Sequence, residues 1–271
     1  MQRIQNETQV SLIISTYNNI EALKVVLRSV RNQTRLPDEV IIADDGSYNE
    51  VKQFIRQETD TFPVPLLHVW QPDEGFRVAH IRNKAIAQSR FDYIISIDGD
   101  IVLHREFIAD HTFFAEKGCF LQGGRVILLR SISQKIIANP ETTIHFFTPS
   151  IYNRHNILRS LGLAKLFTQT HQQSTRRIRG CNASFWKEDL IKVNGYNEEF
   201  VGWGFEDKEL AVRLYHAEVK LKRIRFAAIC FHLHHKVQVN QRRLDENTRL
   251  LKIAQENHLV VCKEGISKYL R

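Results

Sequence analysis

Two kinds of hydrophobic pattern alternate over residues 8–105 of the chain. Short, mainly apolar runs, rich in branched side chains and without regular polar alternation, occupy residues 10–15, 40–43, 66–69 and 93–97. Such runs are typical of strands covered on both faces, as in parallel sheets. Apolar residues recur at helical spacing between the first two runs, at Ile20, Leu23, Leu27 and Val30. With further helices expected over residues 48–58 and 78–89, the pattern predicts an open, mostly parallel sheet flanked by helices.

The pattern beyond residue 105 is less regular. Helices are expected at residues 107–118, 156–167 and 241–257, and strands at residues 120–129 and 220–231. Another helix is predicted to begin near Glu206, because Leu210, Leu214 and Ala217 form an apolar face. Residues 131–177 are basic and polar, which is typical of a mobile insertion or lid over a site.

A chain of 271 residues can form one large α/β domain or two small ones, and its 43% of apolar residues are ample for a core. We expect a single domain over residues 1–271. Its first half is residues 1–105. Its second half is residues 106–235, with the insertion 131–177, and residues 236–271 form a helical tail.

The net charge of +8 and the pI of about 9.4 favour an anionic partner. Nucleic acid, a membrane surface and a phosphorylated small molecule all fit the charge. A nucleic-acid binder should interleave aromatic residues with a basic stripe. Residues 223–236 do contain aromatics, but the histidines there fit a metal site better, so we expect no nucleic acid partner.

The N-terminal sequence and the cysteines favour a cytoplasmic protein. The first residues, MQRIQNETQ, lack the apolar core of a signal peptide, and no apolar run reaches the length of about 18 residues that spans a membrane. Widely spaced cysteines without metal-ligand spacing are expected to be reduced thiols; they are Cys119, Cys181, Cys230 and Cys262.

The segment 156–167 allows two interpretations. Its apolar residues are Leu158, Leu161, Leu163 and Phe167, and they lie next to Arg159 and Lys165. This composition permits peripheral contact with the inner membrane surface. It also fits a solvated helix packed on the domain.

Polar residues follow the ends of the predicted strands. Thr16 ends the first run, Asp45 follows the second, and Asp98 and Asp100 follow the fourth. In open α/β sheets, ligands bind at the carboxyl ends of the strands. Each Asp-Gly pair alone is also ordinary turn chemistry.

Clustered acids in a basic protein suggest a divalent cation. Carboxylate oxygens are ligands of Mg²⁺ and Mn²⁺, and a cation would separate them from a diphosphate that they would otherwise repel. The sequence contains neither a GxGxxG motif nor a Walker-type loop, which argues against a dinucleotide oxidoreductase and a P-loop enzyme.

The second half contains two further candidate sites. Trp203, between two glycines, precedes Glu206 and Asp207, and three histidines lie between His232 and His235. Trp offers a flat face for a sugar ring, and clustered histidines are candidate metal ligands. The alternatives are a core Trp, ordinary helix-start acids and structural histidines. The helix dipole is expected to lower the pKa of both acids.

Taken in order, these motifs resemble a known family. The runs VSLIISTYN, VIIADDGS and ISIDGD look like the nucleotide-binding half of family-two glycosyltransferases with the A-type fold. The later stretch GCNASFWKEDLIKVNGYNEEFVGWGFEDKELAVRL, followed by FHLHH, is similar to the C-terminal half of galactosyltransferase-like and chondroitin-polymerase-type enzymes. The resemblance covers residues 8–105 and 178–236. It implies an A-type glycosyltransferase fold with a single Rossmann-like, mostly parallel mixed sheet flanked by helices.

The resemblance also implies residue roles. Donor-binding positions are Ser15, Thr16, Asp45, Arg77 and Asp98. Metal-binding positions are Asp100, His235 and His232, with Mn²⁺ or Mg²⁺ as the cofactor. Asp207 matches the catalytic base, with Glu206 as its partner, and the acceptor-binding positions are Trp203, Gly204 and Glu206. Lys208 stands where several relatives have a third acid.

The function implied is inverting, metal-dependent transfer of a sugar from a nucleotide-sugar, preferentially a UDP-sugar, to a glycan or glycolipid acceptor. Synthesis of a bacterial cell-envelope polysaccharide or lipopolysaccharide fits the basic charge. Arg176, Arg177 and Arg179 of the insertion are expected to fold over the donor. The alternatives are a retaining transferase on the same fold and a non-catalytic carbohydrate-binding protein.

Overall fold

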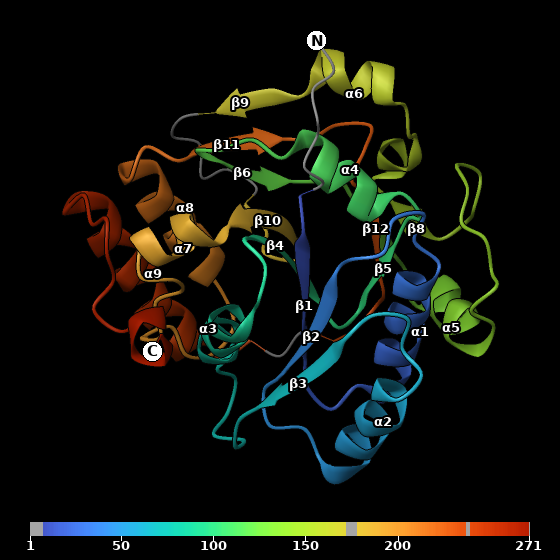
Figure 1. Ribbon diagram of the computed structural model, residues 1–271, viewed down its shortest axis with the longest axis horizontal. Coiled ribbons are helices and arrows are strands. Elements are labelled where there is room, and N and C mark those ends of the chain that lie inside the picture. Colours follow the sequence, from blue (N-terminus) through green and yellow to red (C-terminus); the bar gives the residue numbers. More distant parts are fainter. Residues whose placement is uncertain (1–7, 172–177, 237–238, 271) are drawn as a thin grey trace.

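A computed structural model describes residues 8–171, 178–236 and 239–270 of the chain. Strands and helices alternate through its first part, as the sequence predicts (Figure 1). These elements are β1 (Val10–Thr16), α1 (Ile20–Arg31), β2 (Glu39–Asp44), α2 (Asn49–Thr59), β3 (Leu66–Trp70), α3 (Val78–Gln88) and β4 (Tyr93–Asp98). The strands pair in parallel in the order β3-β2-β1-β4. Every residue of β1 and β2 is buried, which is why neither strand shows the regular polar alternation of a half-exposed strand.

The large sheet continues through antiparallel and parallel neighbours into a mixed sheet of eight strands. Its added strands are β10 (Asn182–Trp186), β6 (Cys119–Gln122), β11 (Lys220–Arg223) and β9 (Gln169–His171). Antiparallel pairing of β10 with β4 brings the second half of the chain alongside the predicted nucleotide-binding half. The α/β class with a large mixed sheet flanked by helices is confirmed.

A second, four-stranded sheet was not predicted from the sequence. Its strands are β5 (Ile101–Leu103), β12 (Cys230–His232), β7 (Arg125–Leu128) and β8 (Ile151–Tyr152). The expected strands at 120–129 and 220–231 were wrong, because each is divided between the two sheets. The chain changes sheets at Gly123, where a Cβ atom would lie 2.2 Å from the carbonyl oxygen of Ala228. This close approach requires glycine.

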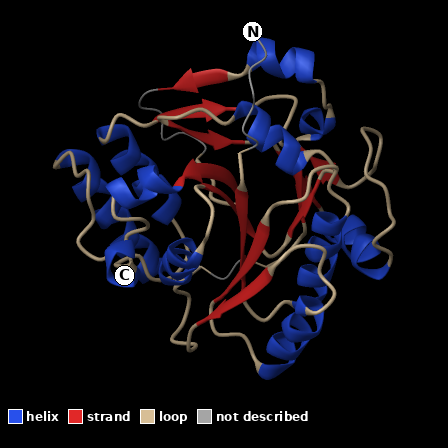
Figure 2. Cartoon of the chain, viewed as in Figure 1, coloured by secondary structure: helices blue, strands red, loops and turns tan. Residues whose placement is uncertain are grey.

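Helices cover both faces of the large sheet (Figure 2). The remaining helices are α4 (Phe107–Phe114), α5 (Arg130–Ala138), α6 (Leu161–Phe167), α7 (Lys187–Lys192), α8 (Glu206–His216) and α9 (Gln241–Glu256). Successive residues of β1 face opposite sides: Leu12 packs with α1, α2 and α4, and Ile13 packs with α3, α7 and α8. Among the described residues, no helix is long and apolar enough to cross a bilayer. The four cysteines are buried free thiols, as expected.

Two predicted helices differ from those observed. The helix expected over 107–118 ends at Phe114. The helix expected over 156–167 is divided into the 3-10 helix η1 (Arg154–Ile157) and α6, because Ser160 adopts an extended conformation and caps α6 through the amide of Leu163. The tail ends in a second 3-10 helix, η2 (Ile266–Tyr269), whose Ile266 is buried in the main core.

Candidate active site

The predicted donor-binding residues meet at the carboxyl edge of the large sheet. Ser15 and Thr16 end β1, Asp45 follows β2, and Asp98 ends β4. The amide of Asp45 donates to the carbonyl of Thr16 over 3.0 Å, and that of Gly99 donates to the carbonyl of Ser15 over 2.7 Å. These backbone bonds hold the three strand ends together. The structure therefore brings these predicted positions to one edge of the sheet.

Asp45 lies in a buried polar pocket. Its carboxylate accepts hydrogen bonds from Gln71 Nε2 over 2.6 Å and from the backbone amide of Arg77 over 2.7 Å. Burial nevertheless raises the pKa of Asp45. The side chain of Arg77 instead contacts Glu74 over 2.7 Å and donates to the carbonyl of Pro72 over 3.0 Å. Sequence reasoning missed Gln71, which follows the edge strand β3 without forming a motif.

A buried arginine joins the two halves of the site. Arg82 of α3 donates from Nη2 to Asp98 over 2.8 Å and from Nη1 to Asp207 over 3.0 Å. Its Nη1 also lies 3.4 Å from Glu206, and its Nε donates to Ser15 Oγ over 3.2 Å. The Arg82 side chain is only 3% exposed. A guanidinium supplies five donors in a planar fork, which suits it to several carboxylates at once.

Sequence reasoning missed Arg82. The sequence feature that could have identified it is the position of this arginine beside Ile81, Ala85 and Ile86, on the buried side of a predicted helix. A charge in that position needs a buried partner. The ring of Tyr196 lies 5.2 Å from the Arg82 guanidinium and supports it by a cation–π contact.

The two acids occupy the first turn of α8, as predicted. Phe205, at the N-cap, has a positive φ of 75°, which turns the chain into the helix. Asp207 accepts a hydrogen bond from the backbone amide of Gly180 over 2.7 Å. A Cβ atom on Gly180 would lie 2.1 Å from Asp207 Oδ1, so this contact requires glycine.

Burial raises the pKa of both acids, contrary to the expectation from the helix dipole. The pKa of Glu206 rises to about 7 through burial and the neighbouring charge of Asp207. Burial also raises the pKa of Asp207, although Arg82 opposes the shift. Desolvation therefore outweighs the dipole here. The Asp207 side chain keeps 22% of its surface exposed, so a ligand can reach it.

Trp203 is a surface residue and not part of the core. Its exposed fraction is 48%. The flanking Gly202 and Gly204 have positive φ angles of 81° and 114°, which only glycine adopts readily. The carbonyl of Gly204 accepts a hydrogen bond from Asn247 of α9 over 3.0 Å, so the tail supports the loop that carries Trp203.

Asp100, His232 and His235 form a cluster in which one potential ligand atom of each lies within 4.8 Å of the others. Asp100 Oδ2 is 3.2 Å from His235 Nε2 and 3.7 Å from His232 Nε2. Antiparallel pairing of β12 with β5 brings His232 next to Asp100. His234 does not belong to the cluster; its side chain is exposed and its backbone amide donates to Ser133.

The cluster has the properties of a divalent cation site. Asp100 Oδ1 is buried and has no hydrogen-bond partner among the described residues. Burial and the charge of Asp98 raise the pKa of Asp100 to about 8, a cost that a bound cation would offset. Burial and the charge of Arg125 lower the pKa of His232 to about 4, which keeps its imidazole neutral and able to bind metal.

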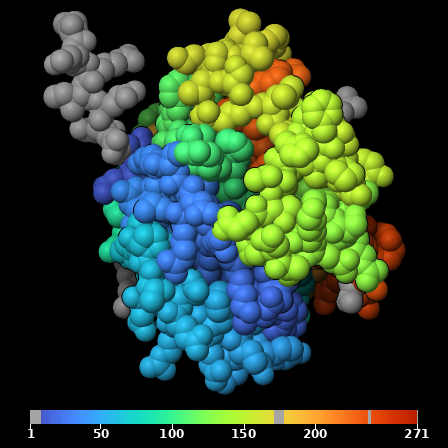
Figure 3. All heavy atoms as spheres, turned by 90° about the vertical axis from the view of Figure 1, so that its right-hand side faces the viewer, coloured from blue at the N-terminus to red at the C-terminus, as the bar shows by residue number. Residues whose placement is uncertain are grey.

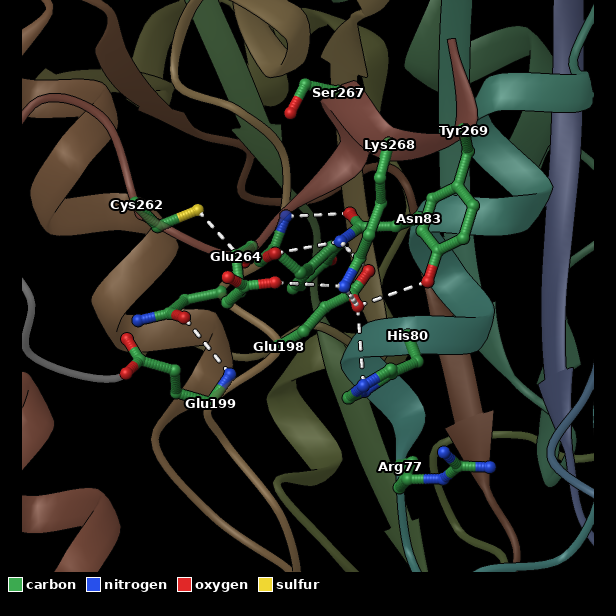
Figure 4. A network of polar contacts seen from close by, with 12 residues as sticks. Arg77, His80, Asn83, Glu198, Glu199, Cys262, Glu264, Ser267, Lys268 and Tyr269 are labelled. Atoms are coloured by element: carbon green, nitrogen blue, oxygen red, sulfur yellow. Dashed lines mark hydrogen bonds and ion pairs between the residues drawn. The ribbon is translucent and has the colours of Figure 1, made fainter.

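A second network of polar contacts joins α3 to Glu198 and to the C-terminal segment (Figure 4). Glu198 accepts a hydrogen bond from Asn83 over 2.9 Å, and its other oxygen contacts Lys268 at 2.6 Å and Tyr269 at 3.1 Å. Asn83 in turn accepts from the backbone amide of Tyr196 over 2.8 Å. The C-terminal segment thus supports the helix that carries Arg82.

The insertion residues expected over the donor are only partly described. Arg176 and Arg177 lie outside the described residues. The backbone amide of Arg179 donates to Gln122 Oε1 over 3.3 Å.

Two family models match the chain. The model described as glycosyl transferase family 2 matches residues 11–177, more than half of the chain. The model described as the N-terminal domain of galactosyltransferase matches residues 164–236.

Curated relatives include two chondroitin synthases. The one from Pasteurella multocida is 26% identical over 225 residues, covering 76% of this chain and 23% of the relative. The one from Escherichia coli is 26% identical over 227 residues, covering 76% of this chain and 32% of the relative. The chain therefore spans about a quarter to a third of the length of these relatives.

Solved structures with the same fold include Staphylococcus aureus TarS in complex with UDP-GlcNAc. It has a TM-score of 0.64 and 15% identity over 91% of this chain and 66% of that one. The mannosyltransferase PcManGT from Pyrobaculum calidifontis, in complex with GDP-Man and Mn²⁺, has a TM-score of 0.60 and 17% identity over 94% of this chain and 65% of that one.

Proposed function

This chain belongs to glycosyltransferase family 2, and we propose that it transfers a sugar from a UDP-sugar to a hydroxyl of a glycan or glycolipid acceptor, with inversion at the anomeric carbon. Structural relatives in complex with UDP-GlcNAc or GDP-Man support a nucleotide-sugar donor. The similarity to chondroitin synthases supports a glycan acceptor.

One observation carries this proposal. Arg82 joins Asp98, at the end of a central strand, to Asp207, at the start of α8, over 2.8 and 3.0 Å. Residues assigned to the donor and to the acceptor therefore border one site. A carbohydrate-binding protein would not need a buried acid pair and a metal-type cluster in the same place.

Asp207 is the proposed general base. It accepts the proton of the acceptor hydroxyl while that oxygen bonds to the anomeric carbon and the bond from this carbon to the diphosphate oxygen breaks. UDP is the leaving group and keeps the electron pair of the broken bond. Burial raises the pKa of Asp207 and makes it a stronger base than an exposed aspartate. Base catalysis of this kind contributes about 10²–10⁴-fold to the rate.

The other residues take supporting roles in this proposal. Glu206 orients the acceptor, and Trp203 and Gly204 form its binding platform. Ser15, Thr16 and Asp45 bind the uracil and ribose, and the buried Thr16 Oγ1, which has no hydrogen-bond partner among the described residues, is available to a ligand. Arg77 flanks the base or the diphosphate, and Asp98 lies near the ribose or the donor sugar.

Asp100, His232 and His235 would hold the metal ion. Their mixed oxygen and nitrogen donors suit Mn²⁺ better than Mg²⁺, which prefers oxygen alone. A bound divalent cation would offset the charge that develops on the leaving diphosphate.

The proposed functional division follows the sequence: residues 1–105 bind the nucleotide-sugar, residues 106–235 carry acceptor and catalytic groups, and residues 236–271 form a supporting tail. The insertion 131–177 separates the two sets of motifs. A cytoplasmic enzyme of cell-envelope polysaccharide or lipopolysaccharide synthesis fits the basic charge and the bacterial relatives.

Peripheral membrane contact is part of this proposal, through α6 and the adjacent Phe113. Leu163, Leu166 and Phe167 of α6 are 43%, 74% and 41% exposed, and Lys165 lies 5.0 Å from the ring of Phe113. Figure 3 shows the yellow segment that contains α6 at one end of the molecule. Exposed apolar residues beside a lysine fit an anionic lipid surface.

Sedimentation with vesicles tests this contact. Leu166→Glu should reduce binding to vesicles that contain an anionic phospholipid, whereas Phe147→Glu, at a 79% exposed position outside α6, should not. Equal binding by both variants and the unchanged protein would argue against α6 as the contact.

A donor screen tests the proposed reaction. Purified protein is incubated with individual UDP-sugars and Mn²⁺, and release of UDP is measured with and without a chelator. The best donor is then offered to candidate glycan acceptors, and NMR of the product gives its anomeric configuration. Retention of configuration would contradict inversion, and chelator-resistant turnover would contradict the metal requirement.

A further inference from the structure

A second arginine faces the site from the small sheet. In the parallel register of β7 and β12, Arg125 stands opposite Cys230 and Ile127 stands opposite His232. Side chains of register partners share a face, and positions two apart on a strand do as well. Arg125 therefore lies on the same face of the sheet as the metal-cluster residue His232. The other face, which includes Val126, belongs to a separate apolar cluster.

The Arg125 side chain also reaches toward the large sheet. Its Nη1 donates to Cys181 Sγ over 3.5 Å. Cys181 directly precedes β10, whose Asn182 pairs with Ile97, the residue before Asp98. The guanidinium thus lies between the metal cluster on one sheet and the strand end that carries Asp98 on the other.

Among the described residues, Arg125 forms no ion pair with a carboxylate, and its buried Nε has no hydrogen-bond partner. The side-chain hydrogen bond that it does form there goes to a thiol, which is a weak acceptor. Arg82, by contrast, contacts three carboxylates. A half-buried guanidinium with unused donors is suited to an oxyanion from outside the chain.

Arg125 places a positive charge near the proposed metal site, because the strand register puts it on the same face as His232. Two cations at one site repel each other, and a multiply charged anion that contacts both would offset this repulsion.

We propose that Arg125 binds the β-phosphate of the donor and stays bound to it as the diphosphate leaves. This inference rests on the proposed nucleotide-sugar transfer and adds a catalytic residue to it. The fork of the guanidinium matches two phosphate oxygens, and its charge acts where negative charge develops when the sugar–oxygen bond breaks. Arg82 is not available for this role, because its guanidinium already contacts the carboxylates of Asp98, Glu206 and Asp207.

Nucleotide binding to the full chain tests the inference without requiring turnover. Calorimetry with Mn²⁺ present measures the affinity of the unchanged protein, Arg125→Met and Arg125→Lys for UDP and for UMP. Loss of a charge-assisted contact to the β-phosphate should weaken UDP binding about 10- to 100-fold in Arg125→Met. UMP, which lacks that phosphate, should bind nearly as before. Arg125→Lys should recover part of the UDP affinity, since it keeps the charge but not the fork.

Arg105→Met is the matched control, because it removes the same charge from a side chain that is 71% exposed and lies beyond β5. It should leave both affinities unchanged. Mn²⁺ binding, measured separately, should be unchanged or tighter in Arg125→Met because a nearby positive charge is gone.

The outcomes separate this inference from the proposed function. Unchanged UDP affinity in Arg125→Met overturns the role of Arg125 alone. Equal weakening of UDP, UMP and Mn²⁺ also overturns it, because that result indicates a structural role. If the unchanged protein binds neither UDP nor another nucleoside diphosphate, the proposed function fails and this inference fails with it.

Discussion

Arg82 Nη1 donates to Asp207 Oδ1 over 3.0 Å, across the boundary between the two halves of the chain. The same guanidinium holds Asp98 at 2.8 Å. One buried cation therefore fixes the proposed base relative to the strand end where the donor is expected to bind. The proposed reaction therefore depends on α3, which carries Arg82.

Arg82→Met should lower kcat/KM at least about 100-fold, because it leaves buried acids without their cation and releases the proposed base. Arg82→Lys should be intermediate, since a lysine cannot bridge the same acids. Kinetics with the best donor measures both. Arg90→Met is the control: it removes the 2.8 Å partner of the buried Glu39, at the opposite end of the sheet, and should cost stability while preserving activity per folded molecule. Equal loss of activity in Arg82→Met and Arg90→Met would indicate a general folding defect.

Asp207→Asn should reduce turnover by about 10²–10⁴-fold, because the amide cannot accept the acceptor proton. Binding of UDP and Mn²⁺ should stay nearly unchanged, since the amide oxygen can still accept from Gly180. Single-turnover kinetics and calorimetry together make this comparison. Near-normal turnover would show that another group is the base.

The histidine cluster contains its own control. His232→Ala and His235→Ala should each weaken Mn²⁺ binding about 10-fold or more, because each removes a ligand. His234→Ala should not, because His234 is exposed and lies outside the cluster. Calorimetric titration with Mn²⁺ distinguishes the three variants. A larger effect of His234→Ala than of the other two would overturn the assignment.

Stability should fall in mild acid because of His111. Its Nδ1 lies 2.8 Å from Ser184 Oγ and its Nε2 lies 2.9 Å from Asn182 Oδ1, and burial lowers its pKa from 6.5 to about 4. Between these values the unfolded chain takes up a proton that the folded protein does not. The free energy of unfolding should therefore decrease by about 1.4 kcal/mol per pH unit from this group as pH falls, with no contribution above about pH 7.

His111→Gln removes this titration. The difference in unfolding free energy between the unchanged protein and His111→Gln, from urea denaturation between about pH 4.5 and 7.5, should therefore change with pH. Other groups contribute equally to both proteins. Parallel pH dependences would refute the role of His111.

The contacts of the C-terminal segment with Glu198 should stabilise α3. Lys268→Met combined with Tyr269→Phe leaves Glu198 with fewer donors and should lower the free energy of unfolding by about 1–3 kcal/mol. Amide hydrogen exchange should accelerate in α3, which shares this network through Asn83. Lys263→Met, at an exposed position of the same segment, should change neither quantity. Unchanged hydrogen exchange in α3 would show that the tail does not stabilise the helix that carries Arg82.

The main elements of the first half could be predicted because each pattern is local. Burial on both faces makes β1, β2 and β4 continuous apolar runs, and one buried face gives α1 its helical spacing. Because parallel strands end at one edge, the sequence alone predicts that Thr16, Asp45 and Asp98 lie close together.

The order of strands in the second half depends on long-range contacts. Residues 120–129 read as one strand, but Gly123 passes so close to Ala228 that the chain leaves one sheet for another. The small sheet that brings Asp100 next to His232 follows from this change. The local hydrophobic pattern does not predict this change of sheet, because it depends on a contact between residues far apart in the sequence.

The sequence by itself therefore determined the elements of the first half, the acids at the strand ends and the acids at the start of α8. Only the tertiary structure decided which charges meet: Arg82 with Asp207, and Arg125 with no acid of the described chain. It also decided that the pKa of Glu206 rises, because desolvation depends on what surrounds a side chain and not on its place in a helix. Periodicity indicates that a residue is buried, whereas packing determines its partner.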